Sequence, residues 1–354
     1  MVELQNNNNT KLAKNQVLTY IPIVLYKVSW RIEKMGKKVR FGRFGFDSLR
    51  HTNPRRPCLQ PKRKSEIMGK RFGDRKDGVK LRNIHAMHFV MPLMYPNRCD
   101  NEAFISERID LTNVNEYLAR KNADNPEYKY NLFQVVVTAV LKTITLRPKM
   151  NGFIANQTMY LRNEVSAAFT VKKIFSDNGA EALAQIRTKG TETIDDIHDE
   201  IFRQVSLCRS DKVDAGTESL NAVASIPGFL VKLVGSAARF LDRHGWMPQS
   251  VIAGDPYYCS AVLTNLGSIK LHAGYHHLTN WGTTSVFCAI GEAKKRPFFQ
   301  EDGTVLMRDS VDIGLTIDER LADGYYYSRT VALLKQLLEN PELLEKPLQE
   351  EVEY

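Results

Sequence analysis

Side chains that could move a proton gather near the C-terminal end of the sequence. The run Asp318-Glu319-Arg320-Leu321-Ala322-Asp323-Gly324 sets Glu319 between an aspartate and an arginine. A glutamate can serve as a general base near neutral pH when burial raises its pKa, whereas pairing with an arginine lowers that pKa. Arg320 and Arg329 lie close by in the sequence. The surroundings of Glu319 therefore decide whether its carboxylate can do chemistry.

Histidines offer a second source of a base, because an imidazole titrates near neutral pH. His272, His276 and His277 lie together in the sequence, shortly after a strand-like run. A pair such as His276-His277 more often supplies polarity at a surface or interface than a base. His85 and His88 have a spacing that some metal sites use, but no third ligand lies nearby, so we expect no metal.

Composition and charge describe an ordinary soluble protein with a basic tail. Hydrophobic residues make up 43% and charged residues 25% of the 354 positions. The net charge is +9, but residues 1–67 alone carry about 15 Lys and Arg against about 4 Asp and Glu, so the remainder is near −2. The five cysteines are scattered, without Cys-x-x-Cys spacing, which favours a reduced, cytoplasmic compartment over a zinc site or a disulfide framework.

Residues 1–67 are expected to be a basic, disordered extension, because an Asn run and a Pro-rich segment rarely build a core. Upstream sequence ahead of a start at Met68 is another interpretation. An anchor for anionic lipid or nucleic acid is the functional alternative, although we expect no nucleic-acid partner. The apolar run from Val17 to Tyr26 is too short to span a bilayer and is interrupted by Pro22.

Hydrophobic periodicity predicts strands and helices in mixed order. A strongly apolar helix is expected over 132–146, since Pro148 follows and the residue before a proline avoids helical geometry. The other expected helices cover 112–121, with Thr112 as the N-cap, 194–208 and 325–338. The expected strands cover 104–111, 153–162, 165–174, 182–187, 259–265, 284–290 and 311–317. This order has no strict βαβ repeat, so it predicts an α+β fold with helices packed against a mixed sheet.

The motif at 318–324 resembles the signature Asp-His-Arg-x-x-Asp-Gly of the acyltransferase component of 2-oxo-acid dehydrogenase complexes. That family shares its fold with chloramphenicol acetyltransferase. Glu319 stands where the family places its catalytic histidine. Segments 147–153, 260–267 and 289–293 are also similar to the family in order and spacing, and the resemblance covers about residues 85–345. Because no recognisable lipoyl or subunit-binding domain precedes it, we expect a free-standing acyltransferase-like domain at 68–354.

The resemblance implies a chloramphenicol acetyltransferase-like fold, a homotrimer with active sites at subunit interfaces, and acyl-CoA as a substrate. In the family the motif histidine takes a proton from the acceptor, and a hydroxyl on the Asn-Leu-Gly strand donates to the oxyanion. Thr264 keeps such a hydroxyl, although packing of a β-branched strand residue explains it equally well. The resemblance gives Asp323 a structural ion pair, and Gly324 supplies backbone freedom before the last helix.

Three interpretations of Glu319 stay open. In the first, burial raises the pKa of Glu319 and makes it the general base. In the second, Glu319 is a structural remnant in a non-catalytic relative that binds CoA or a partner. In the third, a histidine such as His276 or His277 supplies the base instead. An ordinary glutamate, with a pKa of about 4.3, is a weak base for a thiol of pKa about 8.5. We expect an acyltransferase with an unknown thiol, hydroxyl or amine acceptor. The alternatives are the non-catalytic relative and a membrane-surface assembly protein.

The segment 220–244 is a hydrophobic insertion that departs from the family pattern. Its apolar residues are spaced as one face of an amphipathic helix, with Lys232, Arg239 and Arg243 interspersed. The simplest interpretation is a helix that caps the core or forms a subunit interface. A lid over a long acyl chain and a peripheral contact with a membrane surface are the alternatives.

Overall fold

The computed structural model describes residues 71–172, 181–209 and 227–354. The chain divides into two units, Met1–Ile67 and Met68–Tyr354, and all described residues belong to the second. The basic extension and residues 220–226 of the hydrophobic insertion lie outside the described residues.

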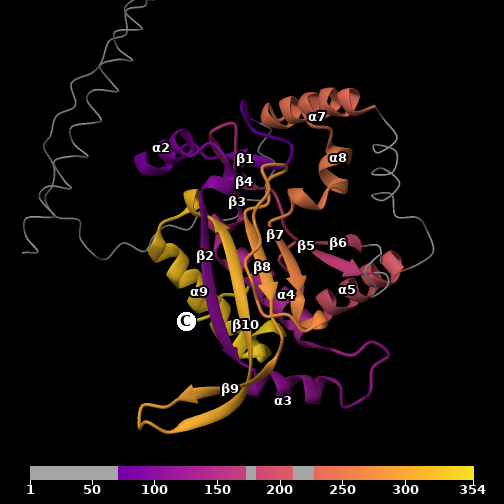
Figure 1. Ribbon diagram of the computed structural model, residues 1–354, viewed down its shortest axis with the longest axis vertical. Helices are drawn as coiled ribbons and strands as arrows, with labels where there is room; N and C mark the ends of the chain where they lie inside the picture. The colour runs from indigo at the N-terminus through magenta and orange to yellow at the C-terminus, as the bar shows by residue number, and fades with distance from the viewer. Residues whose placement is uncertain (1–70, 173–180, 210–226) are drawn as a thin grey trace, which may run out of the picture. The chain divides into compact units, whose positions relative to one another are not determined.

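A mixed sheet forms the centre of the domain (Figure 1). Its strand order is β2-β10-β8-β7-β5-β6, and β9 pairs with β10 beside that path. The strands are β2 (Glu102–Asp110), β5 (Val165–Lys172), β6 (Glu181–Thr188), β7 (Ala261–Asn265), β8 (Val286–Ile290), β9 (Lys294–Phe299) and β10 (Val305–Asp318). The β5–β7 and β7–β8 pairs are parallel and the other pairs are antiparallel. The predicted α+β fold with a mixed sheet is confirmed.

Helices cover one face of this sheet and enclose the main core. They are α3 (Thr112–Lys121), α4 (Leu132–Leu146), α5 (Ile194–Arg209) and α9 (Gly324–Glu339). Alternate residues of β10, including Ile313, Leu315 and Ile317, point into this core, as the strand period of two requires. Helix α4 has the predicted bounds and is buried from Gln134 to Thr145.

A smaller sheet, with strand order β1-β4-β3, lies at one end of the domain. It consists of β1 (Gly78–Lys80), β3 (Gly152–Ala155) and β4 (Thr158–Arg162). The single strand predicted over 153–162 is wrong, because the chain turns at Asn156 and Gln157, whose φ angles are 47° and 59°. The predicted N-cap of α3 is also wrong: Leu111 holds that position, and Asp110 instead accepts the backbone N–H of Thr112 at 2.9 Å.

Three further helices, α2 (Ala86–Met94), α7 (Gly228–Arg243) and α8 (Gln249–Gly254), lie at the same end of the domain (Figure 1). Helix α2, which contains Pro92, and strand β9 are not predicted from the sequence. None of the described helices is long and apolar enough to span a bilayer.

The loop 271–282 lies on the sheet face that the helices leave free. Leu278 of this loop packs against Val262 and Phe287 in a second, smaller apolar cluster. The loop approaches the sheet so closely that a Cβ on Gly314 would overlap the carbonyl oxygen of Gly274. A glycine is therefore needed at position 314, and the loop follows the sheet face toward the end of β10.

Candidate active site at the end of strand β10

Asp318, the last residue of β10, forms the centre of a buried charge network. Its carboxylate is fully buried and accepts hydrogen bonds from Arg320 Nε at 2.7 Å and Arg320 Nη2 at 2.6 Å. The bidentate contact fixes the short helix η5 (Glu319–Leu321), because a guanidinium matches a carboxylate in a planar fork. A second buried arginine, Arg98, brings its Nε to 3.7 Å from Asp318 Oδ2.

Arg98 fastens the loop 271–282 to this end of the sheet. It belongs to the short helix η1 (Arg98–Asp100) and donates from Nη1 to Thr279 O at 2.6 Å and from Nη2 to Gly282 O at 3.1 Å. Burial lowers the pKa of the Arg98 guanidinium, and the charge of Asp318 opposes that shift. Asp318, η5 and the loop are thus held as one unit.

The loop presents His277 next to a buried carboxylate. Glu102, the first residue of β2, pairs in register with Asp318. Its Oε2 lies 2.9 Å from His277 Nδ1, and its Oε1 accepts the backbone N–H of Leu278 at 2.5 Å. The Glu102 side chain is 3% exposed, whereas the His277 side chain is 82% exposed. The imidazole is therefore anchored through one nitrogen and open on its other side.

Glu319 lies at the same end of the sheet, with its side chain exposed. Its backbone N–H donates to Asn101 O at 3.1 Å, directly beside Glu102. Its carboxylate forms no hydrogen bond or ion pair with the described residues. Arg320 is bound to Asp318, and Arg329 donates to the carbonyl oxygen of Tyr354 at 2.5 Å, so neither arginine pairs with Glu319.

His276 and Asp323 have structural contacts in this site. His276 stacks on Phe287, with ring centroids 4.2 Å apart and planes 9° apart, so it holds the loop on the sheet. Asp323 caps α9 by accepting the backbone N–H of Tyr326 at 2.9 Å, and this hydrogen bond lowers the pKa of Asp323. The ion pair expected at Asp323 lies at Asp318 instead. A Cβ on Gly324 would meet open space and its φ angle is not in the left-handed region. The structure therefore does not require a glycine at this position.

Thr264 is half-buried and lies away from this cluster within one chain. In the sheet it pairs with Ala289, which pairs in turn with Gly314. Gly314 is four residues before Asp318 on β10, a distance of about 13 Å along the strand. The structure therefore brings His277 and Glu319 together, but it does not bring Thr264 of the same chain to them.

Sequence reasoning missed Arg98, Glu102 and Asp318 as parts of the site. Glu102 and His277 are 175 positions apart, and no local spacing connects them. A further histidine, His88 of α2, places its Nδ1 3.3 Å from Arg320 O. Its spacing from His85 suggested only a metal site, and no cluster of three metal-ligating side chains is found in the described part of the chain.

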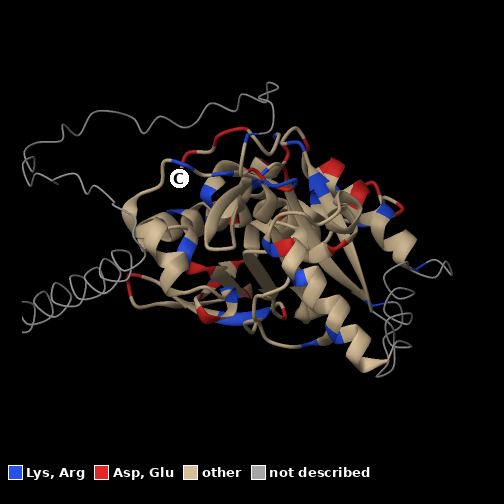
Figure 2. Ribbon diagram, turned by 90° about the horizontal axis from the view of Figure 1, so that it is seen from above, with Lys and Arg blue, Asp and Glu red and all other residues tan. Residues whose placement is uncertain are grey.

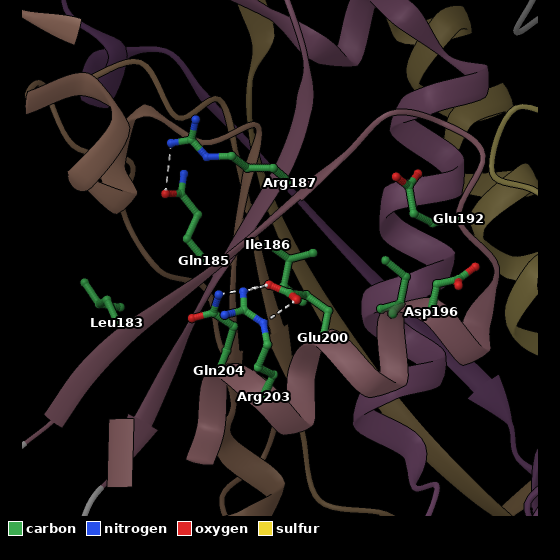
Figure 3. A pocket seen from close by; sticks show the side chains of 10 residues that line it. Leu183, Gln185, Ile186, Arg187, Glu192, Asp196, Glu200, Arg203 and Gln204 are labelled. Carbon is green, nitrogen blue, oxygen red and sulfur yellow. Dashed lines mark hydrogen bonds and ion pairs between the residues drawn. The ribbon is translucent and has the colours of Figure 1, made fainter. Parts of the chain in front are cut away.

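A separate groove of about 580 Å³ lies between β6 and α5 (Figure 3). Its charged side chains already have partners. Glu200 binds Arg203 at 2.6 Å and Gln204 at 2.9 Å, Arg187 binds Glu164, and the carboxylates of Glu192 and Asp196 accept backbone N–H groups. The groove therefore offers no free charged group for catalysis. Buried thiols are also poor nucleophiles, because burial raises the pKa of Cys259 to about 11 and of Cys288 to about 12.

Comparison with known proteins agrees with this fold. Residues 259–345, which include the end of β10 and Thr264, match the family of 2-oxoacid dehydrogenases acyltransferase (catalytic domain). The matched segment makes up about a quarter of the chain. The resemblance seen in the sequence is thereby confirmed. No curated protein matches the chain.

The solved structures that resemble this chain share little sequence with it. The cubic core of the pyruvate dehydrogenase multienzyme complex is 14% identical, covers 75% of this chain and 94% of its own, and has a TM-score of 0.50. The dihydrolipoamide acetyltransferase of Azotobacter vinelandii gives the same values. Chloramphenicol acetyltransferase is 13% identical over 75% of this chain and 99% of its own, with a TM-score of 0.45.

Proposed function

We propose that this domain transfers an acyl group from acyl-CoA, or another acyl thioester, to a thiol, hydroxyl or amine acceptor, with His277 as the general base. The 2.9 Å contact between His277 Nδ1 and Glu102 Oε2 carries the proposal. A buried carboxylate favours the proton on Nδ1, which leaves the lone pair of Nε2 free to accept a proton. Glu102 is then a positioning residue.

In this proposal His277 moves the proton from the acceptor to the CoA thiol. His277 Nε2 takes the proton of the acceptor, whose sulfur, oxygen or nitrogen attacks the thioester carbonyl carbon. The oxyanion that forms needs a fixed donor, and the Thr264 hydroxyl is the group that could supply it. When the tetrahedral intermediate collapses, the C–S bond breaks and CoA leaves as the thiol, with the proton returned from His277.

We further propose that Thr264 comes from a neighbouring subunit of a homotrimer. Within one chain Thr264 lies at the level of Gly314, about 13 Å or more from the end of β10, so it cannot reach an oxyanion beside His277. A site shared between two subunits removes this separation. The 82% exposure of the His277 side chain also leaves it open to a partner surface.

Glu319 is the less favoured base in this proposal. Its side chain is exposed, and no hydrogen bond or ion pair with the described residues orients its carboxylate. His277 offers an imidazole with an oriented tautomer at the same end of the sheet, next to the backbone that holds Glu319. Acyl transfer with His277 as the base therefore does not require Glu319 to accept the proton.

The test is thiol release from acyl-CoAs of increasing chain length, with thiol, alcohol and amine acceptors. His277→Gln should lower turnover by about 10²- to 10⁴-fold, the usual contribution of a general base. Glu102→Gln should lower kcat with little change in KM, because it misorients the base without removing a substrate contact. His276→Gln is the matched comparison and should have the smaller effect, since it only loosens the loop.

Two outcomes would overturn the proposal. Turnover that survives His277→Gln but is lost in Glu319→Gln would make Glu319 the base. No turnover by the parent protein, with activity gained in Glu319→His, would identify a non-catalytic relative that has kept the fold.

A further inference from the structure

Helix α7 displays an apolar surface that the described domain does not cover. None of its residues is buried. Phe229 is 72% exposed, Leu233 65%, Val234 60% and Phe240 53%, all far above the exposure of a helix that packs on a core. The expectation that this helix caps the core is therefore wrong.

The most exposed aromatic and leucine side chains of α7 lie on the side that points away from the body of the domain. The helix is held through Asp242, which binds Arg75 at 2.9 Å, and through Ala238, which packs against a small apolar cluster. With about 100° of rotation per residue, Ala238 and Asp242 share one side of the helix. Phe229, Leu233 and Phe240 then lie on the opposite side, which faces outward.

A row of positive charge runs beside this apolar surface. Lys232, Arg239 and Arg243 are exposed and spaced by seven and four residues, so they line one edge of the helix. The helix has a single acidic residue, Asp242, which is already bound to Arg75. Figure 2 looks onto the end of the domain that carries α7, with lysine and arginine in blue.

Aromatic rings extend the outward surface past the end of α7. Trp246 is 60% exposed and lies 5.9 Å from Phe240 and 5.2 Å from His244, measured between ring centroids. Tryptophan is enriched where protein meets the interface between lipid and water, because its ring is apolar and its N–H is polar.

We propose that α7 binds an anionic membrane surface, with its apolar side inserted between lipids and its basic row on the headgroups. An outward apolar side flanked by lysine and arginine is the pattern of helices that lie in the membrane interface. The α7 helix of a second copy is a poorer occupant, because two α7 helices in contact provide no free acidic partner for the basic row. This proposal goes beyond the proposed function and does not rest on it.

Full-length protein should sediment with vesicles of phosphatidylcholine and phosphatidylserine more than with vesicles of phosphatidylcholine alone. The measurement is repeated at high salt, which screens the charges of the basic extension and of the α7 basic row but not the insertion of apolar side chains. Leu233→Asp should weaken partitioning by about tenfold or more, because each inserted leucine is worth at least that much. Leu306→Asp, at an exposed leucine of β10, is the matched control and should bind like the parent.

A second readout places the helix in the lipid. Vesicles should shift the tryptophan emission of the parent to the blue, and the shift should be lost in Trp246→Phe. The proposal is overturned if Leu233→Asp binds like the parent, if neither vesicle binds, or if the parent self-associates without lipid and Leu233→Asp abolishes that association. The last result would assign the surface to a second copy.

Discussion

At the scale of single residues, Asp318 and Arg98 hold the site together although neither offers chemistry of its own. Asp318 binds Arg320 at 2.6 Å, and Arg98 reaches the carbonyl oxygens of Thr279 and Gly282. The sequence motif drew attention to Glu319 and Asp323, which are both exposed. The buried aspartate is the one that orients η5, and the exposed one caps a helix.

Replacement of Asp318 by asparagine should strongly destabilise the domain. The substitution leaves Arg320 and Arg98 buried without a counter-charge, which costs about 3–5 kcal/mol in the free energy of unfolding. Urea denaturation followed by circular dichroism measures the loss. Glu342→Gln breaks the exposed pair with Arg120 and should cost about 1 kcal/mol or less. Equal losses in the two variants would contradict the structural role given to Asp318.

At the scale of elements, the loop 271–282 decides which residues can meet. Sequence periodicity predicted most of the strands and helices, because each of them depends on a local pattern of apolar residues. Nothing local in the loop predicts that His277 reaches Glu102, 175 positions away, or that Gly314 allows the loop to lie on the sheet. Helix α2 was missed because Pro92 interrupts its pattern. The contacts of the candidate site are therefore seen only in the folded structure and are not predicted by the motif at 318–324.

Gly314→Ala should disturb the loop and lower activity. The new methyl group would overlap the carbonyl oxygen of Gly274, so either the loop or β10 must move, at a cost of about 1–3 kcal/mol in stability. Turnover and the urea midpoint should both fall. Gly235→Ala in α7 is the control: its Cβ meets open space, and alanine should stabilise the helix by about 0.5–1 kcal/mol. A Gly314→Ala protein with parent activity would argue that the loop does not position the base.

At the scale of the whole molecule, the proposed acyl transfer calls for more than one chain. His277 lies beside Glu102 near the end of β10, whereas the hydroxyl of Thr264 lies at the level of Gly314 in the same sheet. Residues 259–345 match the acyltransferase family, and the solved structures share the fold at low sequence identity. The family match does not identify a base, and the proposal of His277 rests on its contact with Glu102.

Complementation between subunits tests the central claim most directly. Thr264→Val and His277→Gln are each prepared as inactive proteins, and are then mixed under conditions that exchange subunits. If each site takes His277 from one subunit and Thr264 from its neighbour, random mixing should restore about a quarter of the parent activity per site. Activity that never exceeds the sum of the two separate variants would contradict a site shared between subunits.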